Sequence, residues 1–150
     1  MYRHCIGLIF ALLALLPLGA CTDKTNAGDA ISRAETALDD AQFDRAQDIC
    51  DSLVNGDGCA SLSTSDLCRT SLVYIKLAEV REQEFNTASA MTCLGAAMSK
   101  DSAAVDDFIA QQPADDQSML IMVRTLVGRT QLSDFKDEPV DNFDQYSDSI

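Results

Sequence analysis

The stretch from Leu67 to Val80 constrains the fold of this chain more than any other. Its apolar residues fall on nearly every side of a helix: Leu67, Cys68, Leu72, Val73, Tyr74, Ile75, Leu77, Ala78 and Val80. A helix that is apolar all round is usually buried at the centre of its domain. Ser63 and Asp66 stand three residues apart just before this stretch, as in a capping box. The sequence therefore predicts a central helix that begins at Ser63.

The flanking segments have the apolar spacing of amphipathic helices. Apolar residues recur every three or four positions in stretches that begin at Asp29, Phe43, Asn86, Asp101 and Asp115. Asp29, Asn86 and Asp101 are placed to cap their helices. Gly56 can close the second helix in the left-handed conformation, and Pro113 stops the fifth. Since no stretch alternates convincingly between apolar and polar residues, we expect an all-α fold of about six helices, arranged as antiparallel hairpins.

One of these hairpins resembles a tetratricopeptide unit. In "ALDDAQFDRAQDICDSL", Phe43 occupies the aromatic position at the turn and Ala46 the small position where two helices cross. Phe85 and Ala88 repeat this spacing 42 residues further on. That offset exceeds the family's repeat of about 34 residues, and the proline expected at the end of a repeat is absent. Both a tetratricopeptide-like arrangement and an irregular bundle remain open.

The N-terminus has the organisation of an export signal. A short basic start is followed by "CIGLIFALLALLPLGA", which carries no charge and ends in small residues. This run is a little short for a membrane-spanning helix, which needs about 20 apolar residues. A basic start, an apolar middle and a small-residue end are typical of a secretory signal peptide.

The end of this run, "LGAC" at residues 18–21, resembles the lipobox of bacterial lipoproteins. The resemblance implies cleavage between Ala20 and Cys21, a diacylglycerol thioether on Cys21, and acylation (palmitate or a similar chain) of the new amine. Thr22 then implies sorting to the outer membrane. Several acyl chains make a stable membrane anchor. The alternatives are an ordinary secretory signal or an N-terminal membrane helix, with Cys21 an incidental thiol.

The chain as a whole resembles small helical lipoproteins of Bacteroidota. The resemblance rests on the lipobox and on "SLSTSDLCRTSLVYIKLAE", and it implies no activity. The resulting organisation is a signal peptide at residues 1–20, a polar tether at 21–28, a helical domain at 29–133 and an acidic tail at 134–150. The tail combines low hydrophobicity with high negative charge, which predicts disorder.

Four cysteines remain once Cys5 is removed with the signal and Cys21 is lipidated: Cys50, Cys59, Cys68 and Cys93. Export to an oxidising compartment favours disulfides, so we expect at least one bridge among them. Four cysteines allow three connectivities, and the sequence does not choose between them. The alternative is that Cys50, Cys68 and Cys93 are small buried thiols on helix faces. No C-x-x-C motif is present, and the spacings do not fit a zinc ribbon.

Composition excludes several classes of function. The formal net charge is −13, which disfavours nucleic acid as a partner. The only histidine, His4, lies in the signal, so the usual Ser-His-Asp and Cys-His catalysis and most zinc sites are excluded. Asp39–Asp40, Asp106–Asp107 and Asp115–Asp116 are adjacent pairs whose side chains diverge by about 100° on a helix, so we do not expect a pair to face one substrate. We expect no catalytic residue, metal or cofactor.

These observations predict a non-enzymatic binding or scaffold module, held in the bacterial cell envelope by its lipid. Its partner would be a peptide or another envelope protein. Neither the periplasmic nor the outer face of the membrane is indicated. Two other readings remain open, namely an envelope hydrolase that uses carboxylates and a purely structural spacer.

Overall fold

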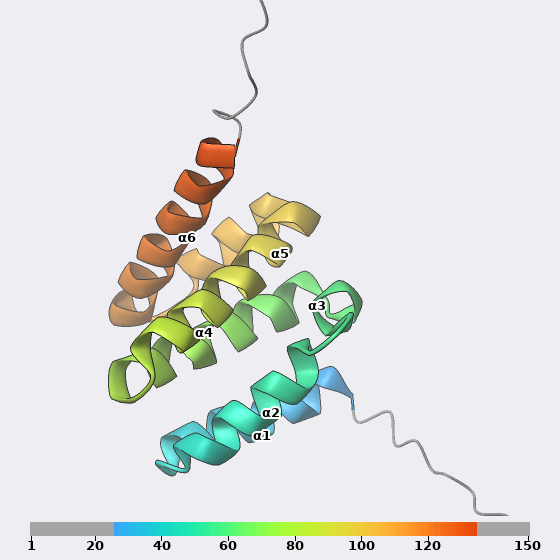
Figure 1. Cartoon of the computed structure of the whole chain (residues 1–150), viewed down its shortest axis with the longest axis vertical. Coiled ribbons are helices and arrows are strands. Elements are labelled where there is room, and N and C mark those ends of the chain that lie inside the picture. Colours follow the sequence, from blue (N-terminus) through green and yellow to red (C-terminus); the bar gives the residue numbers. More distant parts are fainter. Residues whose placement is uncertain (1–25, 135–150) are drawn as a thin grey trace, which may run out of the picture.

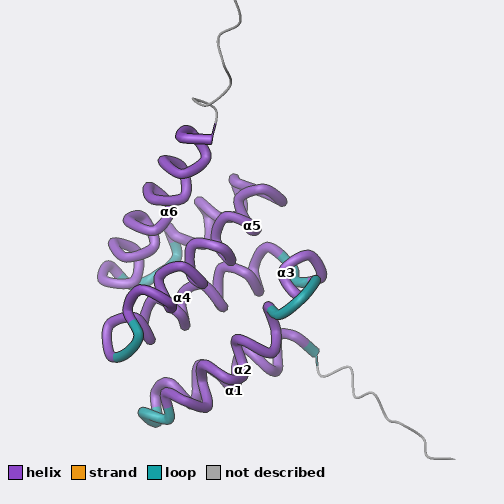
Figure 2. The backbone as a smooth tube through the Cα atoms, viewed as in Figure 1, coloured by secondary structure: helices purple, strands orange, loops and turns teal. Residues whose placement is uncertain are grey.

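The computed structural model describes residues 26–134, with side chains described to residue 130. Six helices span this region (Figures 1 and 2): α1 Ala27–Asp39, α2 Phe43–Val54, α3 Gly58–Ser61, α4 Thr64–Val80, α5 Gln83–Ala110 and α6 Ala114–Asp134. No strand occurs within residues 26–134, so the predicted all-α fold is confirmed. The predicted signal peptide, its cleavage site at Ala20 and Cys21, and most of the predicted tether and tail lie outside the described residues.

The helices pack around α4 as an irregular bundle. Helices α1 and α2 form an antiparallel hairpin, and α4 packs against α1, α2, α5 and α6. Helix α5 runs back along α4, and α6 lies on α5 and the far side of α4 (Figure 1). Short α3 joins the α1–α2 hairpin to the rest and contacts α2 and α5. The predicted central position of α4 is therefore confirmed.

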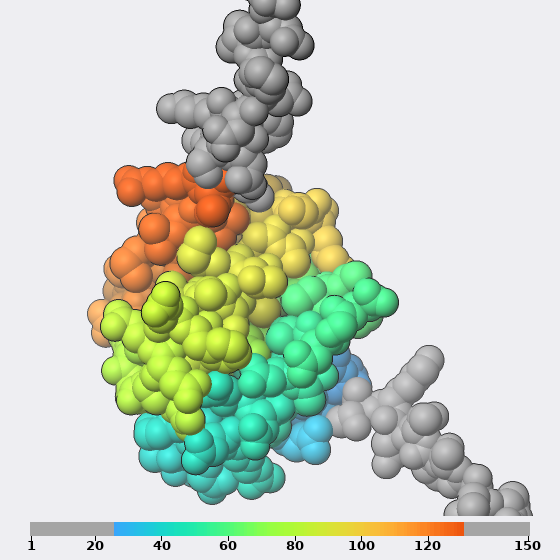
Figure 3. Space-filling view, in the orientation of Figure 1, coloured from blue at the N-terminus to red at the C-terminus, as the bar shows by residue number. Residues whose placement is uncertain are grey.

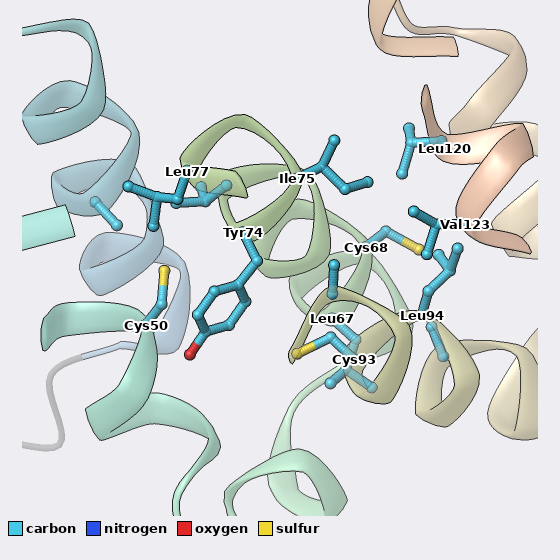
Figure 4. Close-up of a cluster of buried hydrophobic side chains, with 14 of the residues drawn as sticks. Cys50, Leu67, Cys68, Tyr74, Ile75, Leu77, Cys93, Leu94, Leu120 and Val123 are labelled. Atoms are coloured by element: carbon cyan, nitrogen blue, oxygen red, sulfur yellow. The ribbon is translucent and has the colours of Figure 1, made fainter. Parts of the chain in front are cut away.

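Helix α4 supplies the largest part of the core, as its apolar pattern predicts. Tyr74, Leu67 and Leu77 are fully buried and meet Leu94 of α5 and Leu120 of α6 in one cluster (Figure 4). The capping box that opens α4 is present. Ser63 Oγ accepts a hydrogen bond from the Asp66 backbone N–H at 3.1 Å and donates to Asp66 Oδ2 at 2.7 Å.

Two predicted caps are wrong. Helix α1 is capped by Asn26, whose Oδ1 accepts from the Gly28 N–H at 3.3 Å, and Asp29 lies in the first turn, where its charge suits the helix dipole. Helix α5 begins at Gln83, because Glu82 takes the left-handed conformation (φ 41°) and turns the chain early. Asn86 is therefore buried inside α5, and its Nδ2 donates to the Arg81 carbonyl at 3.0 Å.

Two other local predictions are confirmed. Gly56 has φ 61°, the left-handed conformation expected after α2. Asp101 leaves the helical conformation (φ −160°, ψ 94°), and its Oδ1 accepts from the Ala104 N–H at 3.0 Å, as a helix cap does. The two helices expected on either side of Asp101 are thus one element, α5, with a kink at this residue.

The second tetratricopeptide-like stretch does not pack like the first. Ala46 is fully buried where α2 meets its neighbours, whereas Ala88 is exposed on α5. Phe43 is half-buried, whereas Phe85 is exposed. The shared spacing of these residues therefore reflects two helix starts rather than two equivalent repeats.

Candidate functional site

A hollow of about 630 Å³ opens where three distant segments of the chain meet. The α1–α2 turn, the C-terminal end of α4 and the start of α6 lie on the same side of the molecule (Figure 1). Figure 3 shows the yellow-green end of α4 and the first part of α5 at the surface between the α1–α2 hairpin and α6. The lining residues are Leu38, Asp39, Phe43, Lys76, Glu79, Val80, Asp115, Asp116, Ser118 and Met119.

A second hollow of about 240 Å³ adjoins the first. Its lining residues are Ile75, Ala78, Glu79, Gln83, Thr87, Met119, Met122 and Val123. Because Glu79 and Met119 border both hollows, the two lie side by side along the C-terminal half of α4. We call the residues that line the two hollows the α4–α6 groove.

The groove exposes large apolar side chains. Val80 is 54% exposed in the larger hollow, and Met122 is 57% exposed in the smaller one. Half-buried Met119 joins them at the boundary. Methionine adapts its shape to what it contacts, which suits a binding surface. Contiguous exposed apolar surface with a polar rim is typical of an interaction site.

The rim of the groove carries uncompensated negative charge. Lys76 Nζ pairs with Asp116 Oδ2 at 3.0 Å, and the Asp116 side chain is only 15% exposed. Among the described residues, no ion pair involves Asp39, Glu79 or Asp115. Three carboxylates of the lining are thus free to meet cations from outside the chain.

The arrangement of Asp115 and Asp116 corrects one prediction. These neighbours were not expected to face a common partner, yet both border the same hollow. The hollow wraps the N-terminal end of α6 instead of following one stripe along it, so side chains that diverge around the helix both reach it.

The other basic residues with ion pairs are engaged elsewhere. Arg69 binds Glu35 through two hydrogen bonds, of 2.9 Å from Nε and 2.6 Å from Nη2, and the hydrogen bond to Glu35 raises the pKa of Arg69. Arg81 pairs with Asp44, and Arg124 with Asp106 at 2.8 Å. These pairs join helices around the groove and leave its acidic rim unneutralised.

The structure separates the four predicted disulfide residues into two environments. All four are free thiols, so the predicted bridge stays a prediction. Cys68 lies toward Leu94 and Val123, away from Cys50 and Cys93 (Figure 4). Cys59 of α3 lies beside Cys93 of α5, where it adds to the effect of burial in raising the pKa of Cys93.

Burial makes the buried thiols poor nucleophiles. It raises the pKa of Cys50 to about 12 and that of Cys68 to about 11. Since the thiolate is the reactive form, neither residue has the environment of a catalytic cysteine. Within residues 26–134, no group of three or more His, Cys, Asp or Glu side chains is arranged to hold a metal ion. No helix in that same range is long and apolar enough to cross a membrane.

The groove was not found from the sequence, because its residues come from three segments that only packing brings together. Cys21, the residue predicted to be lipidated, and its neighbour Ala20 lie outside the described range. No protein-family model, no curated protein and no solved structure matches this chain.

Proposed function

We propose that this protein is a lipid-anchored component of the bacterial envelope whose helical domain binds a basic, amphipathic segment of another envelope protein. The observation that carries the proposal is the α4–α6 groove, which combines exposed apolar side chains with unpaired carboxylates. The lipobox supports the anchor, and Thr22 supports an outer-membrane location. Binding, not catalysis, is the proposed task.

The chemistry of the partner follows from the lining. Val80, Met119 and Met122 offer an apolar floor of the kind that takes the apolar face of a helix. Asp39, Glu79 and Asp115 surround this floor with negative charge. A segment with Leu-like residues on one face and Lys or Arg beside them matches both features. An acidic segment is repelled by the same rim.

A matched pair of peptides tests this proposal. The probe is a fluorescent helical peptide of leucine and lysine, about four turns long, and the control has each lysine replaced by glutamate. We expect the lysine peptide to bind and the glutamate peptide not to bind. Raising the salt concentration should weaken binding, because the rim charges are exposed and screened.

Neighbouring surface residues provide the controls for folding. Asp39→Lys should weaken binding of the lysine peptide about tenfold, equivalent to about 1.4 kcal/mol, and Asp40→Lys should not, since Asp40 is outside the lining. Met122→Ser should weaken binding, whereas Ile121→Ser should not, although Ile121 is also half-exposed. Equal effects within either pair, or tighter binding of the glutamate peptide, would contradict the proposed groove.

The anchor is tested separately in cells. Cys21→Ala should abolish labelling with a fatty-acid analogue and leave the precursor uncut, because the thiol that receives the lipid is gone. Cys5→Ala, the matched control in the same signal, should be labelled and processed normally. Labelling that persists in the Cys21→Ala protein would refute the lipobox without bearing on the groove.

A further inference from the structure

We propose that Cys59 and Cys93 form a disulfide bond in the envelope, while Cys50 and Cys68 remain thiols. The proposal rests on the export that the proposed function includes, and it selects one pair where the sequence leaves three connectivities. Such a bond ties α3 to α5.

The first support is the position of α3 against α5. The two helices are in contact. Lys100, which lies two helical turns after Cys93 on α5, donates from Nζ to the carbonyls of Ala60 and Leu62, at 2.7 Å each. Residues spaced by seven share a helix face, so Cys93 and Lys100 present the same side of α5. Ala60 follows Cys59 directly, and this contact therefore holds the Cys59 backbone on the Cys93 side of α5.

The second support is the tight turn that orients Cys59. A Cβ at Gly58 would lie 2.0 Å from the Leu53 carbonyl oxygen, so only glycine allows the chain to pass α2 this closely. The half-buried Cys59 thiol lies 4.0 Å from the Val54 carbonyl oxygen and packs against the core. This orientation brings Cys59 near the buried Cys93, whose pKa Cys59 helps to raise.

The other two thiols lie apart from this pair. In the view of Figure 4, the Tyr74 ring stands between Cys50 and Cys93, and Cys68 lies on the opposite side of the core. A disulfide requires Cα atoms within about 7 Å and Cβ atoms that face each other. Burial raises the pKa of Cys68, whereas the pKa of Cys93 is raised by burial, then by Cys59 and less by Cys50.

The reaction is a two-electron thiol–disulfide exchange with a disulfide oxidant of the envelope, R–S–S–R. Cys59 is the more accessible thiol, so its thiolate attacks one sulfur of the oxidant and releases the first R–S⁻, which takes up a proton. The Cys93 thiolate then attacks the Cys59 sulfur and releases the second R–S⁻. One S–S bond breaks and one forms, both cysteines are oxidised, and two R–SH are produced.

Peptide mapping of the full chain from the envelope tests the pairing. Trypsin leaves Cys50, Cys59 and Cys68 in one peptide, because no Lys or Arg lies between Arg45 and Arg69. A second protease that cuts before aspartate separates the three. After blocking free thiols with N-ethylmaleimide, we expect the Cys59 peptide joined to the Cys93 peptide, and alkylated Cys50 and Cys68.

Variants and a second preparation complete the test. Cys59→Ser should eliminate the bridge and Cys68→Ser should retain it. The melting temperature of the bridged protein should fall on the order of 10 °C on reduction, and that of Cys59→Ser should not change. The full chain carrying Cys5→Ser and Cys21→Ser, equilibrated with oxidised glutathione, forms the bridge independently of export. If the Cys59–Cys93 bridge forms in glutathione but not in the protein isolated from cells, the pairing is supported and the proposed export is contradicted. Four free thiols in glutathione, or a bridge to Cys50 or Cys68, overturn the proposal.

Discussion

Replacing Tyr74 with alanine is expected to destabilise the domain by about 3–5 kcal/mol, as removal of a buried aromatic side chain does. Among the residues whose burial is described, Tyr74 has the largest fully buried side chain, and it lies near the centre of α4, between the α1–α2 hairpin and α5 (Figure 4). Its hydroxyl donates to Asp51 Oδ1 at 2.5 Å, which joins α4 to α2. Alanine removes the ring and this hydrogen bond together. The free energy of unfolding, measured by urea titration, gives the effect.

Tyr74→Phe separates the two contributions. The ring stays, and only the hydrogen bond to Asp51 is lost. A hydrogen bond to a charged group contributes about 1.5–3 kcal/mol, and Asp51 is half-buried, so its carboxylate recovers part of that through water. We therefore expect the phenylalanine variant to lose about 1–2 kcal/mol. A loss equal to that of alanine would show that the ring contributes little to the core.

The second large effect is a loss of stability at alkaline pH. Burial raises the pKa of Cys50 from about 9 to about 12 and that of Cys68 to about 11. The pKa of Tyr74 is also raised, first by burial and then by the hydrogen bond to Asp51. In each case the folded state holds its proton at a pH where the unfolded state releases it. The two protonated thiols stabilise the folded state fully below pH 9. This stabilisation is lost as the pH rises toward 11, the pKa of Cys68, and 12, the pKa of Cys50.

The size of this effect follows from proton linkage. Each thiol contributes a slope of about 1.4 kcal/mol per pH unit above its unfolded pKa. Two thiols together should therefore lower the free energy of unfolding by several kcal/mol between pH 9 and 11. Urea titrations at a series of pH values, with reductant present, measure the slope. Because the pKa of Cys93 is raised as well, three thiols contribute to the slope, and Cys50→Ala should reduce it by about a third between pH 9 and 10. A urea midpoint that stays constant from pH 8 to 10.5 would contradict the burial of these thiols.

Features that depend on neighbours in the chain were predictable from the sequence. The cap at Ser63 and Asp66, the turn at Gly56 and the break at Asp101 each follow from side chains within a few residues. The predicted caps at Asp29 and Asn86 failed because each helix begins earlier than expected, α1 after the Asn26 cap and α5 after Glu82, which makes no side-chain cap. Asn26 precedes Asp29, and the turn at Glu82 starts α5 before Asn86.

Features that depend on packing were not predictable. The groove joins residues near positions 38, 79 and 119, and nothing local marks Met122 as exposed and Val123 as buried on the same helix. The proximity of Cys59 to Cys93 likewise depends on where α3 rests on α5. Lys100 holds α3 against α5 through the carbonyls of Ala60 and Leu62, and no sequence motif around Lys100 predicts these two hydrogen bonds.

The direction of α1 places the groove at the end of this helix that is remote from the preceding chain. The described chain enters α1 at Ala27, and the groove residues Leu38 and Asp39 are at its other end (Figure 1). With 13 residues and a rise of about 1.5 Å per residue, the helix is about 20 Å long. That length exceeds the Debye length of about 8 Å at physiological salt. Charges at the two ends of α1 are therefore largely screened from one another, and a negative group attached ahead of α1 would change the groove's preference for cations little.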